Sequence, residues 1–253
     1  MSRTATRTLR LTNDAVYRGD LLLINPDHPL RQQPGDDALA ELCPGVRLEK
    51  KAAAILARVL EAIGAGRRIV AVSGYRTMAE QQAIYADATA RHGPEYARTY
   101  VALPGCSEHQ SGLAIDLAES AGAIDFITPA FPYSGICQTF RRAAVRYGFI
   151  ERYPKGKEAV TRIGHEPWHF RYIGLPHAAL LTRLGLTLEE YTSWLRGYEH
   201  GKNPYLLEDG THAWELGFVP AAEGGCTEIE IGAMPYTLSG NNVDGFVLAV
   251  WRA

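Results

Sequence analysis

Two segments of the chain alternate apolar and polar residues with the two-residue period of a β-strand. In residues 113–118, leucine and isoleucine alternate with alanines and Asp116. In residues 168–172, three aromatic residues alternate with His169 and Arg171. We therefore predict two strands whose apolar faces pack on a core, while Asp116 and His169 lie on the opposite faces.

Other segments show the 3.6-residue period of a helix. Apolar residues recur on one face over residues 48–63, and Gly64 follows them as a stop signal. Thr77 and Glu80 form a capping box at the start of a second helix over residues 78–91. Further helices are predicted around residues 140–147, 176–184 and 188–196.

Helices and short strands mixed in this order predict an α+β fold with a small antiparallel or mixed central sheet flanked by helices. From about residue 197 the pattern changes to strands separated by Gly, Pro and Asn turns. These strands are expected at residues 213–219, 227–231 and 245–251. We predict a larger domain over residues 1–196 and a small β-rich C-terminal extension over residues 197–253 that packs on it.

Composition narrows the class of protein. The 253 residues are 46% hydrophobic, which is enough for a substantial core and excludes a disordered chain. The formal charge of -2 lacks the basic excess that would attract nucleic acid or anionic lipid. We therefore expect no nucleic-acid partner.

The N-terminus and the cysteines bear on the compartment. The first residues carry charges but no apolar segment follows them, so no signal peptide is predicted. The early apolar run Leu21–Ile24 is too short to span a bilayer and is interpreted as a strand. The four cysteines show no CxxC spacing, as expected for free thiols. We predict a cytoplasmic protein without a membrane anchor.

Three side chains could hold a metal ion. A catalytic zinc takes three nitrogen or oxygen ligands and keeps one position for water, and His109, Asp116 and His169 meet that requirement. Glu166 then supplies a second carboxylate that could act as the base. A buried carboxylate needs a partner, so at this point Asp116 could pair either with a metal or with an arginine.

The spacing of Glu166 and His169 raises a geometric problem. In an unbroken strand, residues three apart point to opposite faces. The chain must therefore bend near residues 164–167, where Gly and Pro permit it, if both side chains are to share a site.

Arg76 follows a short apolar strand over residues 70–73, at a strand end where sites are commonly assembled. Its guanidinium suits a developing oxyanion or a peptide carboxylate, although an ordinary surface arginine is the alternative. Gln81 lies on the buried stripe of the second helix and needs a hydrogen-bond partner. Ser107, by itself, reads as a turn residue.

Three ordered motifs carry a resemblance to a known family. They are Ser73-Gly74-Tyr75-Arg76, the segment GCSEHQSGLAID at residues 105–116, and EPWH at residues 166–169. The chain from about residue 25 to residue 174 resembles the VanY and VanXY group of zinc D-alanyl-D-alanine carboxypeptidases and dipeptidases, most closely the VanXY type.

The resemblance implies a mononuclear zinc site and a role for each motif residue. It implies one Zn²⁺ on His109, Asp116 and His169, with Glu166 as catalytic base and Arg76 stabilising the tetrahedral intermediate. Gln81 and Ser107 are implied as substrate-binding groups, and we expect Ser73 and Tyr75 to join them.

The expected activity is hydrolysis of D-Ala-D-Ala and removal of the terminal D-Ala from the muramyl pentapeptide precursor, which confers vancomycin resistance. The expected partner is a small peptide substrate. By the same resemblance, the long segment over residues 119–135 lies near the substrate.

Other functions stay open at this point. An L,D-carboxypeptidase, an endolysin-like peptidase or a non-catalytic peptidoglycan-binding domain could carry the same zinc site. Cys106 could be a nucleophile only if His109 were free to activate it, which zinc binding would prevent. The remaining histidines, including His165 beside Glu166, are interpreted as structural.

Overall fold

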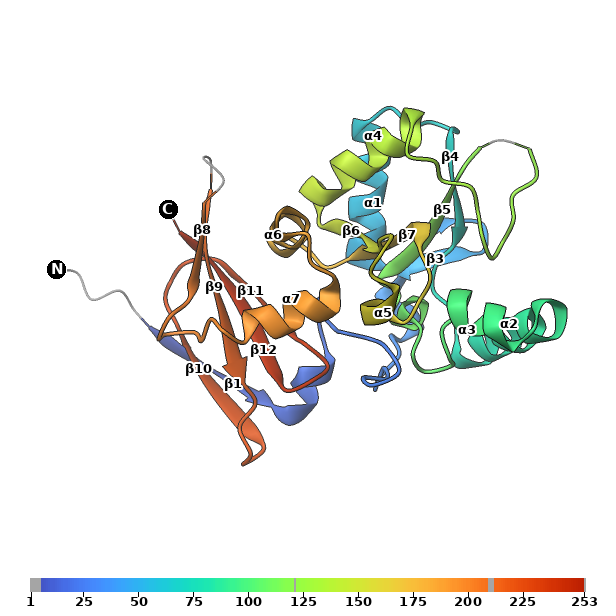
Figure 1. Ribbon diagram of the computed structural model, residues 1–253. Helices are drawn as coiled ribbons and strands as arrows, with labels where there is room; N and C mark the ends of the chain where they lie inside the picture. Colours follow the sequence, from blue (N-terminus) through green and yellow to red (C-terminus); the bar gives the residue numbers. More distant parts are fainter. Residues whose placement is uncertain (1–5, 121, 209–211, 253) are drawn as a thin grey trace. The chain divides into compact units, whose positions relative to one another are not determined.

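The computed structural model describes residues 6–120, 122–208 and 212–252, and the chain divides into two compact units (Figure 1). One unit runs from Ile24 to Leu188, and the other combines the chain up to Leu23 with the chain from Glu189 onward. The division thus falls eight residues earlier than the predicted boundary, and the N-terminal segment belongs to the β-rich unit. It does so because β1 (Arg7–Thr12) pairs with β10 (Cys226–Ile231).

The larger unit contains helices and strands in mixed order, as the predicted α+β class requires. Its strands are β2 (Leu39–Cys43), β3 (Val46–Glu49), β4 (Ile69–Ser73), β5 (Ala114–Glu119), β6 (Phe149–Tyr153) and β7 (Glu166–Tyr172). Its helices are α1 (Lys50–Ala62), α2 (Met78–His92), α3 (Pro94–Tyr100), α4 (Gly135–Ala144), α5 (Glu158–Thr161) and α6 (His177–Leu184).

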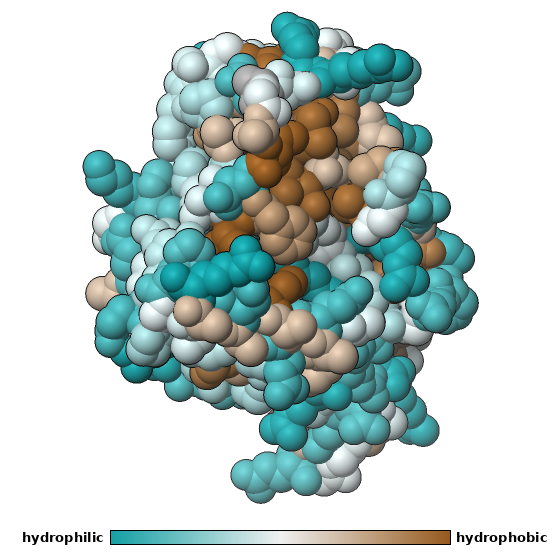
Figure 2. All heavy atoms as spheres, turned by 90° about the vertical axis from the view of Figure 1, so that its right-hand side faces the viewer, coloured by the Kyte–Doolittle hydropathy of each residue, from teal (hydrophilic) through white to brown (hydrophobic). Residues whose placement is uncertain are grey.

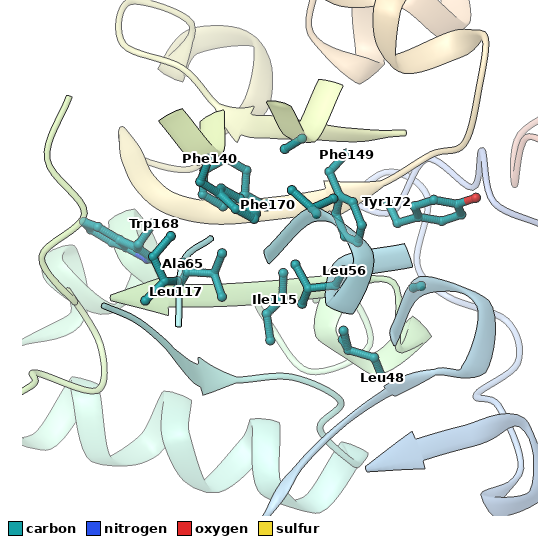
Figure 3. Packing of buried hydrophobic residues seen from close by; sticks show 14 of the residues in the cluster. Leu48, Leu56, Ala65, Ile115, Leu117, Phe140, Phe149, Trp168, Phe170 and Tyr172 are labelled. Carbon is teal, nitrogen blue, oxygen red and sulfur yellow. The ribbon is translucent and has the colours of Figure 1, made fainter. Parts of the chain in front are cut away.

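An antiparallel sheet of four strands in the order β4-β5-β7-β6 forms the centre of this unit. Its apolar face carries Ile115, Leu117 and Phe170, which pack with Leu56 of α1 and Phe140 of α4 (Figure 3). Each fully buried side chain of this size contributes about 1.5–3 kcal/mol. This packing fixes the sheet and leaves its other face for polar side chains.

The helices follow the predictions with two corrections. The capping box of Thr77 and Glu80 is present at the start of α2. The predicted helix over residues 48–63 begins only at Lys50, because Leu48 pairs with Ala40 in the β2–β3 hairpin. The segment after α2 contains the helix α3, which was not predicted, and its first residue Pro94 suits a helix N-terminus.

A long loop joins β5 to α4, as the sequence indicated. It carries the exposed apolar side chains of Ile124 and Phe126. Figure 2 shows apolar residues gathered in a hollow on the face that includes this loop.

The β-rich unit contains a second antiparallel sheet, in the order β11-β12-β9-β8, and the β1–β10 pair. Its elements are α7 (Leu188–Leu195), which begins at the unit boundary, β8 (Tyr205–Glu208), β9 (Ala213–Pro220), β11 (Tyr236–Gly240) and β12 (Gly245–Arg252). The three strands predicted in this region are therefore confirmed, and their core includes Val16, Ile229 and Leu248. Of the helices that the structure describes, none has the length and hydropathy that a membrane span needs.

One strand prediction was wrong. Leu21–Ile24 is buried but forms no strand. The backbone N–H of Leu21 donates to Ser239 Oγ at 2.9 Å, and the backbone N–H of Leu23 donates to the carbonyl of Asn241 at 3.1 Å. Because these single contacts satisfy the two N–H groups, the apolar run needs no partner strand.

Candidate active site

The polar face of the central sheet brings three side chains into one row. Ser73 of β4 lies opposite Asp116 of β5, and Asp116 lies opposite His169 of β7. His109 comes from the 3₁₀ turn Glu108–Ser111 just before β5, which ends at Gly112 in the left-handed conformation. Cross-strand neighbours on one face lie within side-chain reach of each other, so strand pairing itself assembles the row.

The three expected metal ligands converge. Each of His109, Asp116 and His169 is buried and offers one ligand atom, and these atoms all lie within 4.8 Å of one another. His109 Nε2 is 3.0 Å from Asp116 Oδ2, and His169 Nδ1 is 2.9 Å from Asp116 Oδ1. Two imidazoles and one carboxylate are a donor set that zinc commonly takes in hydrolases.

Each histidine presents one ring nitrogen to Asp116 and the other to a fixed acceptor. His109 Nδ1 lies 2.7 Å from the carbonyl oxygen of Gly74, and His169 Nε2 lies 3.4 Å from Glu108 Oε2. Histidines that bind metals nearly always donate their second N–H to such a carbonyl or carboxylate. The surroundings of both rings therefore fit a bound metal ion.

Burial and neighbouring charges shift the pKa values of the three expected metal ligands in different directions. Burial and the guanidinium of Arg76 lower the pKa of His109 to about 4. Burial would lower the pKa of His169 too, but hydrogen bonds to Asp116 and Glu108 raise it to about 9. For Asp116, burial is outweighed by both histidines, so its pKa lies well below the usual range. Asp116 is thus an anion throughout the neutral range.

Glu166 lies on the same side as the metal ligands despite its spacing from His169. Opposite β7, the pairing jumps from Glu151–Phe170 to Tyr153–Glu166, so three β7 residues face one β6 residue. This irregularity is the bend that the sequence required, and Glu166 Oε2 comes within 3.8 Å of His169 Nδ1. Burial raises the pKa of Glu166 to about 8. Near-neutral pKa values suit a group that accepts and returns a proton.

Arg76 is not an ordinary surface side chain, since only 12% of it is exposed. Its Nη2 donates to Asp116 Oδ2 at 2.9 Å, its Nε to Ser73 Oγ at 2.8 Å, and its Nη1 to Gln81 Oε1 at 3.3 Å. Gln81 in turn donates to the carbonyl of Ala102 at 2.8 Å. Asp116 therefore has the arginine partner that the sequence left open, alongside both histidines.

These residues line a pocket that is open to solvent. The expected site residues that line it are Arg76, Ser107, His109, Asp116, Glu166 and His169. Apolar side chains complete the wall, among them Ile127 and Trp168.

Three expected substrate-binding residues have other surroundings. Ser73 and Gln81 contact the guanidinium of Arg76. Tyr75 lies beside β3, where the Arg47 guanidinium stands 5.3 Å from its ring centre. Ser73 and Gln81 thus hold Arg76, whereas Tyr75 contacts a strand of the β2–β3 hairpin.

Cys106 lines a neighbouring pocket, and burial raises the pKa of its thiol. A raised pKa opposes thiolate formation, so this environment does not suit a nucleophile.

Three buried charged residues lie beside the site without having been predicted as site residues. Arg152 Nε donates to Glu108 Oε1 at 2.8 Å, and Arg171 Nη1 lies 3.0 Å from the same oxygen. Arg171 shares the strand parity of His169, which was the available signal. Glu108 and Arg152 carried no comparable pattern, because turns and bulges place them.

Comparison with known proteins identifies the family. Residues 45–175 match the VanY family, described as D-alanyl-D-alanine carboxypeptidase. The chain belongs to this family. The resemblance predicted from the three motifs is confirmed.

Relatives within the VanY family include the bifunctional D-Ala-D-Ala dipeptidase and carboxypeptidase VanXYC of Enterococcus gallinarum. The chain is 42% identical to it over 179 residues, which cover 69% of this chain and 94% of VanXYC. A solved structure of the vancomycin resistance D,D-dipeptidase VanXYg, in complex with a D-Ala-D-Ala phosphinate analogue, superposes with a TM-score of 0.95. The two sequences are 45% identical, and the match covers 98% of this chain and all of that one.

A second solved structure bears on the metal. It is a variant of the D,D-pentapeptidase VanY from a VanB-type resistance cassette in complex with Zn(II). It is 31% identical, with a TM-score of 0.58 over 68% of this chain and 98% of that one. Zinc in this relative agrees with the donor set of His109, Asp116 and His169.

Proposed function

We propose that this protein is a zinc-dependent D,D-dipeptidase and D,D-carboxypeptidase. It would hydrolyse D-Ala-D-Ala and remove the terminal D-Ala from peptidoglycan precursor pentapeptides, which eliminates the target of vancomycin. The observation that carries the proposal is the pocket in which a His-Asp-His ligand set, a buried carboxylate and a largely buried arginine converge, on a fold that matches VanXYg over 98% of the chain.

His109, Asp116 and His169 would hold one zinc ion, through the nitrogens and the carboxylate that face each other across the row. When bound, zinc polarises a peptide carbonyl and lowers the pKa of water towards neutrality. Arg76 keeps the Asp116 carboxylate in place by a hydrogen bond of 2.9 Å.

Glu166 would act as the general base and then as the general acid. Its carboxylate lines the pocket beside the expected metal ligands, with Oε2 3.8 Å from His169 Nδ1. It accepts the proton of the attacking water and passes it to the departing amine of D-Ala. General acid–base catalysis of this kind contributes on the order of 10²–10⁴-fold.

Arg76 would stabilise the negative charge on the attacked carbonyl oxygen. Ser73 and Gln81 fix its guanidinium from behind, and such a preorganised donor stabilises developing charge without reorganising during the reaction. Ser107, on the cavity wall, would bind the substrate. For Tyr75 the contact with Arg47 favours a supporting role over direct substrate binding.

A purely binding function fits the site less well. A structural zinc site has no use for a buried carboxylate with a raised pKa or for a held arginine at the same cavity. Both features favour catalysis.

The experiment pairs metal analysis with D-alanine release by wild type and Glu166→Ala. The substrates are D-Ala-D-Ala, a pentapeptide ending in D-Ala-D-Ala, and a tetrapeptide with an L,D terminal bond. We expect zinc at one ion per chain in both proteins, cleavage of the two D,D substrates by wild type, and a loss of on the order of 10²–10⁴-fold in the variant. Glu158→Ala, a change of an exposed glutamate in α5, serves as the control.

Three outcomes contradict parts of this proposal. Zinc-loaded wild type that cleaves neither D,D substrate rejects the activity. Cleavage of the L,D substrate alone assigns the L,D-carboxypeptidase alternative. A Glu166→Ala enzyme near full rate requires another base. The cytoplasmic location and the packing of residues 197–253 on the catalytic part stay predictions.

A further inference from the structure

A buried ion cluster lies directly behind the candidate metal site. Glu108 occupies its centre, and the side chains of Glu108, Arg152 and Arg171 are all 0% exposed. One carboxylate oxygen, Oε1, accepts a hydrogen bond from Arg152 Nε at 2.8 Å and forms an ion pair with Arg171 Nη1 at 3.0 Å. The other oxygen, Oε2, faces His169 Nε2 at 3.4 Å. The two arginines therefore fix the carboxylate while one oxygen stays directed at the histidine.

Such a cluster is a poor way to stabilise a fold. Removing three charges from water costs several kcal/mol per ion, and well-packed apolar residues often do as well or better. The other face of the same sheet shows that this chain packs apolar residues closely where only stability is needed. The cluster therefore calls for a reason other than stability.

The reason lies in the ring of His169. Its Nδ1 faces Asp116 Oδ1 and its Nε2 faces Glu108 Oε2. An imidazole that coordinates through Nδ1 must carry its proton on Nε2, and an acceptor opposite Nε2 selects that tautomer. For His109, the carbonyl oxygen of Gly74 is the acceptor opposite Nδ1, so it selects the tautomer that leaves Nε2 free of a proton.

We propose that Glu108 is a positioning residue for the metal site: its carboxylate accepts the Nε2–H of His169, which fixes the ring and presents Nδ1 to the ion. Arg152 and Arg171 hold the carboxylate at that place. The inference rests on the zinc site of the proposed function. It adds to that site a residue that contacts the ligand His169 rather than the ion.

Two substitutions test it. Glu108→Gln keeps the length and shape of the side chain, but an amide has only one acceptor oxygen. Its NH₂ group would face either the two arginines or the Nε2–H of His169, and both of these are donors. Glu108→Asp keeps the charge that both arginines need, but it shortens the side chain by one methylene, so it cannot keep both the arginine contacts and the 3.4 Å approach to His169. Glu215→Gln is the control, because Glu215 is a buried carboxylate that pairs with Arg252 in the β-rich unit.

The readout is zinc affinity, measured by competition with a chromophoric chelator, together with the visible spectrum of the Co²⁺-substituted protein. Loss of an outer partner of a ligating histidine typically weakens metal binding about 10–100-fold. We expect that loss for Glu108→Gln, a smaller loss for Glu108→Asp, and altered Co²⁺ bands in both. Glu215→Gln should match wild type.

The proposal is overturned if Glu108→Asp binds zinc within about twofold of wild type with an unchanged Co²⁺ spectrum, since the arginines alone then explain the carboxylate. If Glu108→Gln does not fold, Glu108→Asp decides the question by itself. Because no substrate is used, a wild type that binds zinc but cleaves no D,D peptide would reject the proposed activity and leave this inference standing.

Discussion

The two four-stranded sheets of this protein differ in what their strands bury besides the apolar core. The central sheet buries Asp116, His169 and Arg171 on the face opposite its apolar packing. The sheet of the β-rich unit buries mainly apolar residues, with Glu215 of β9 as its buried carboxylate. Both sheets are antiparallel and of equal strand number, so topology does not explain the difference.

This comparison shows where the chain buries charged side chains despite the cost in folding free energy. Buried charges need partners, and an unpaired one destabilises a fold by several kcal/mol. In the central sheet Asp116, His169 and Arg171 belong to one connected set, since Asp116 contacts His169, and both His169 and Arg171 contact Glu108. The face of the central sheet that buries charges is thus the face that carries the candidate active site. The sheet of the β-rich unit buries mainly apolar residues instead.

The largest difference should follow from removing one carboxylate from each sheet. Asp116→Asn takes away an anionic ligand, so zinc binding should weaken and D-alanine release should fall by about 10²-fold or more. Glu215→Gln should leave both unchanged. Metal analysis and a D-alanine assay on the two variants check this, and a fully zinc-loaded, fully active Asp116→Asn protein would refute it.

The apolar faces should respond alike. Phe170 and Phe246 are both fully buried, one in each sheet. Truncation to alanine should cost about 3–5 kcal/mol of unfolding free energy in either case, because a cavity is left behind. Urea unfolding followed by circular dichroism measures the cost. A cost below about 1 kcal/mol at one site would show that its core can collapse around the cavity.

Substituting two closely packed glycines compares the effect of steric strain beside the site with its effect in the β-rich unit. A Cβ on Gly74 would lie 2.2 Å from the Arg47 carbonyl oxygen, and a Cβ on Gly240 would lie 2.2 Å from that of Val16. Each Gly→Ala change should destabilise its unit by about 1–3 kcal/mol.

Only Gly74→Ala should also weaken zinc binding, since the Gly74 carbonyl faces His109 Nδ1. Thermal unfolding and chelator competition separate the two effects. Equal zinc affinity in both variants would remove Gly74 from the support of His109.

The smallest effect concerns acid. Burial lowers the pKa of His177 in α6 to about 3, whereas an unfolded histidine titrates near 6.5. The unfolded state therefore binds the proton first, and the stability that neutral His177 provides is present above about pH 6.5 and is lost as the pH falls towards 3. His177→Gln should flatten this decline. Urea midpoints at pH 7 and 4.5 test it, and parallel declines in wild type and variant would argue against it.

Local patterns predicted much of the fold. Alternation over residues 113–118 and 168–172 identified β5 and β7 and the faces of Asp116 and His169. Thr77 and Glu80 marked the start of α2. These predictions held because period and capping depend on neighbours within one turn or one strand.

The errors arose where distant groups decide. Leu21–Ile24 has the composition of a strand, but its backbone groups bond to the loop at Asn241 and to Ser239. Residues 7–12 join the β-rich unit by pairing with a strand more than two hundred residues away. Neither long-range pairing leaves a mark within its own segment.

By itself, the sequence determined the family, the α+β class, and the residue types that meet at the site, since the motifs around His109, Asp116 and Glu166 are short and ordered. The tertiary structure alone decided how they meet. A register shift in β7 brings Glu166 beside His169, Asp116 takes Arg76 as a partner, and Glu108 with two buried arginines lies behind the histidine. The physical reason is that buried charges are placed by partners from other strands, and such pairing depends on register, which no local pattern records.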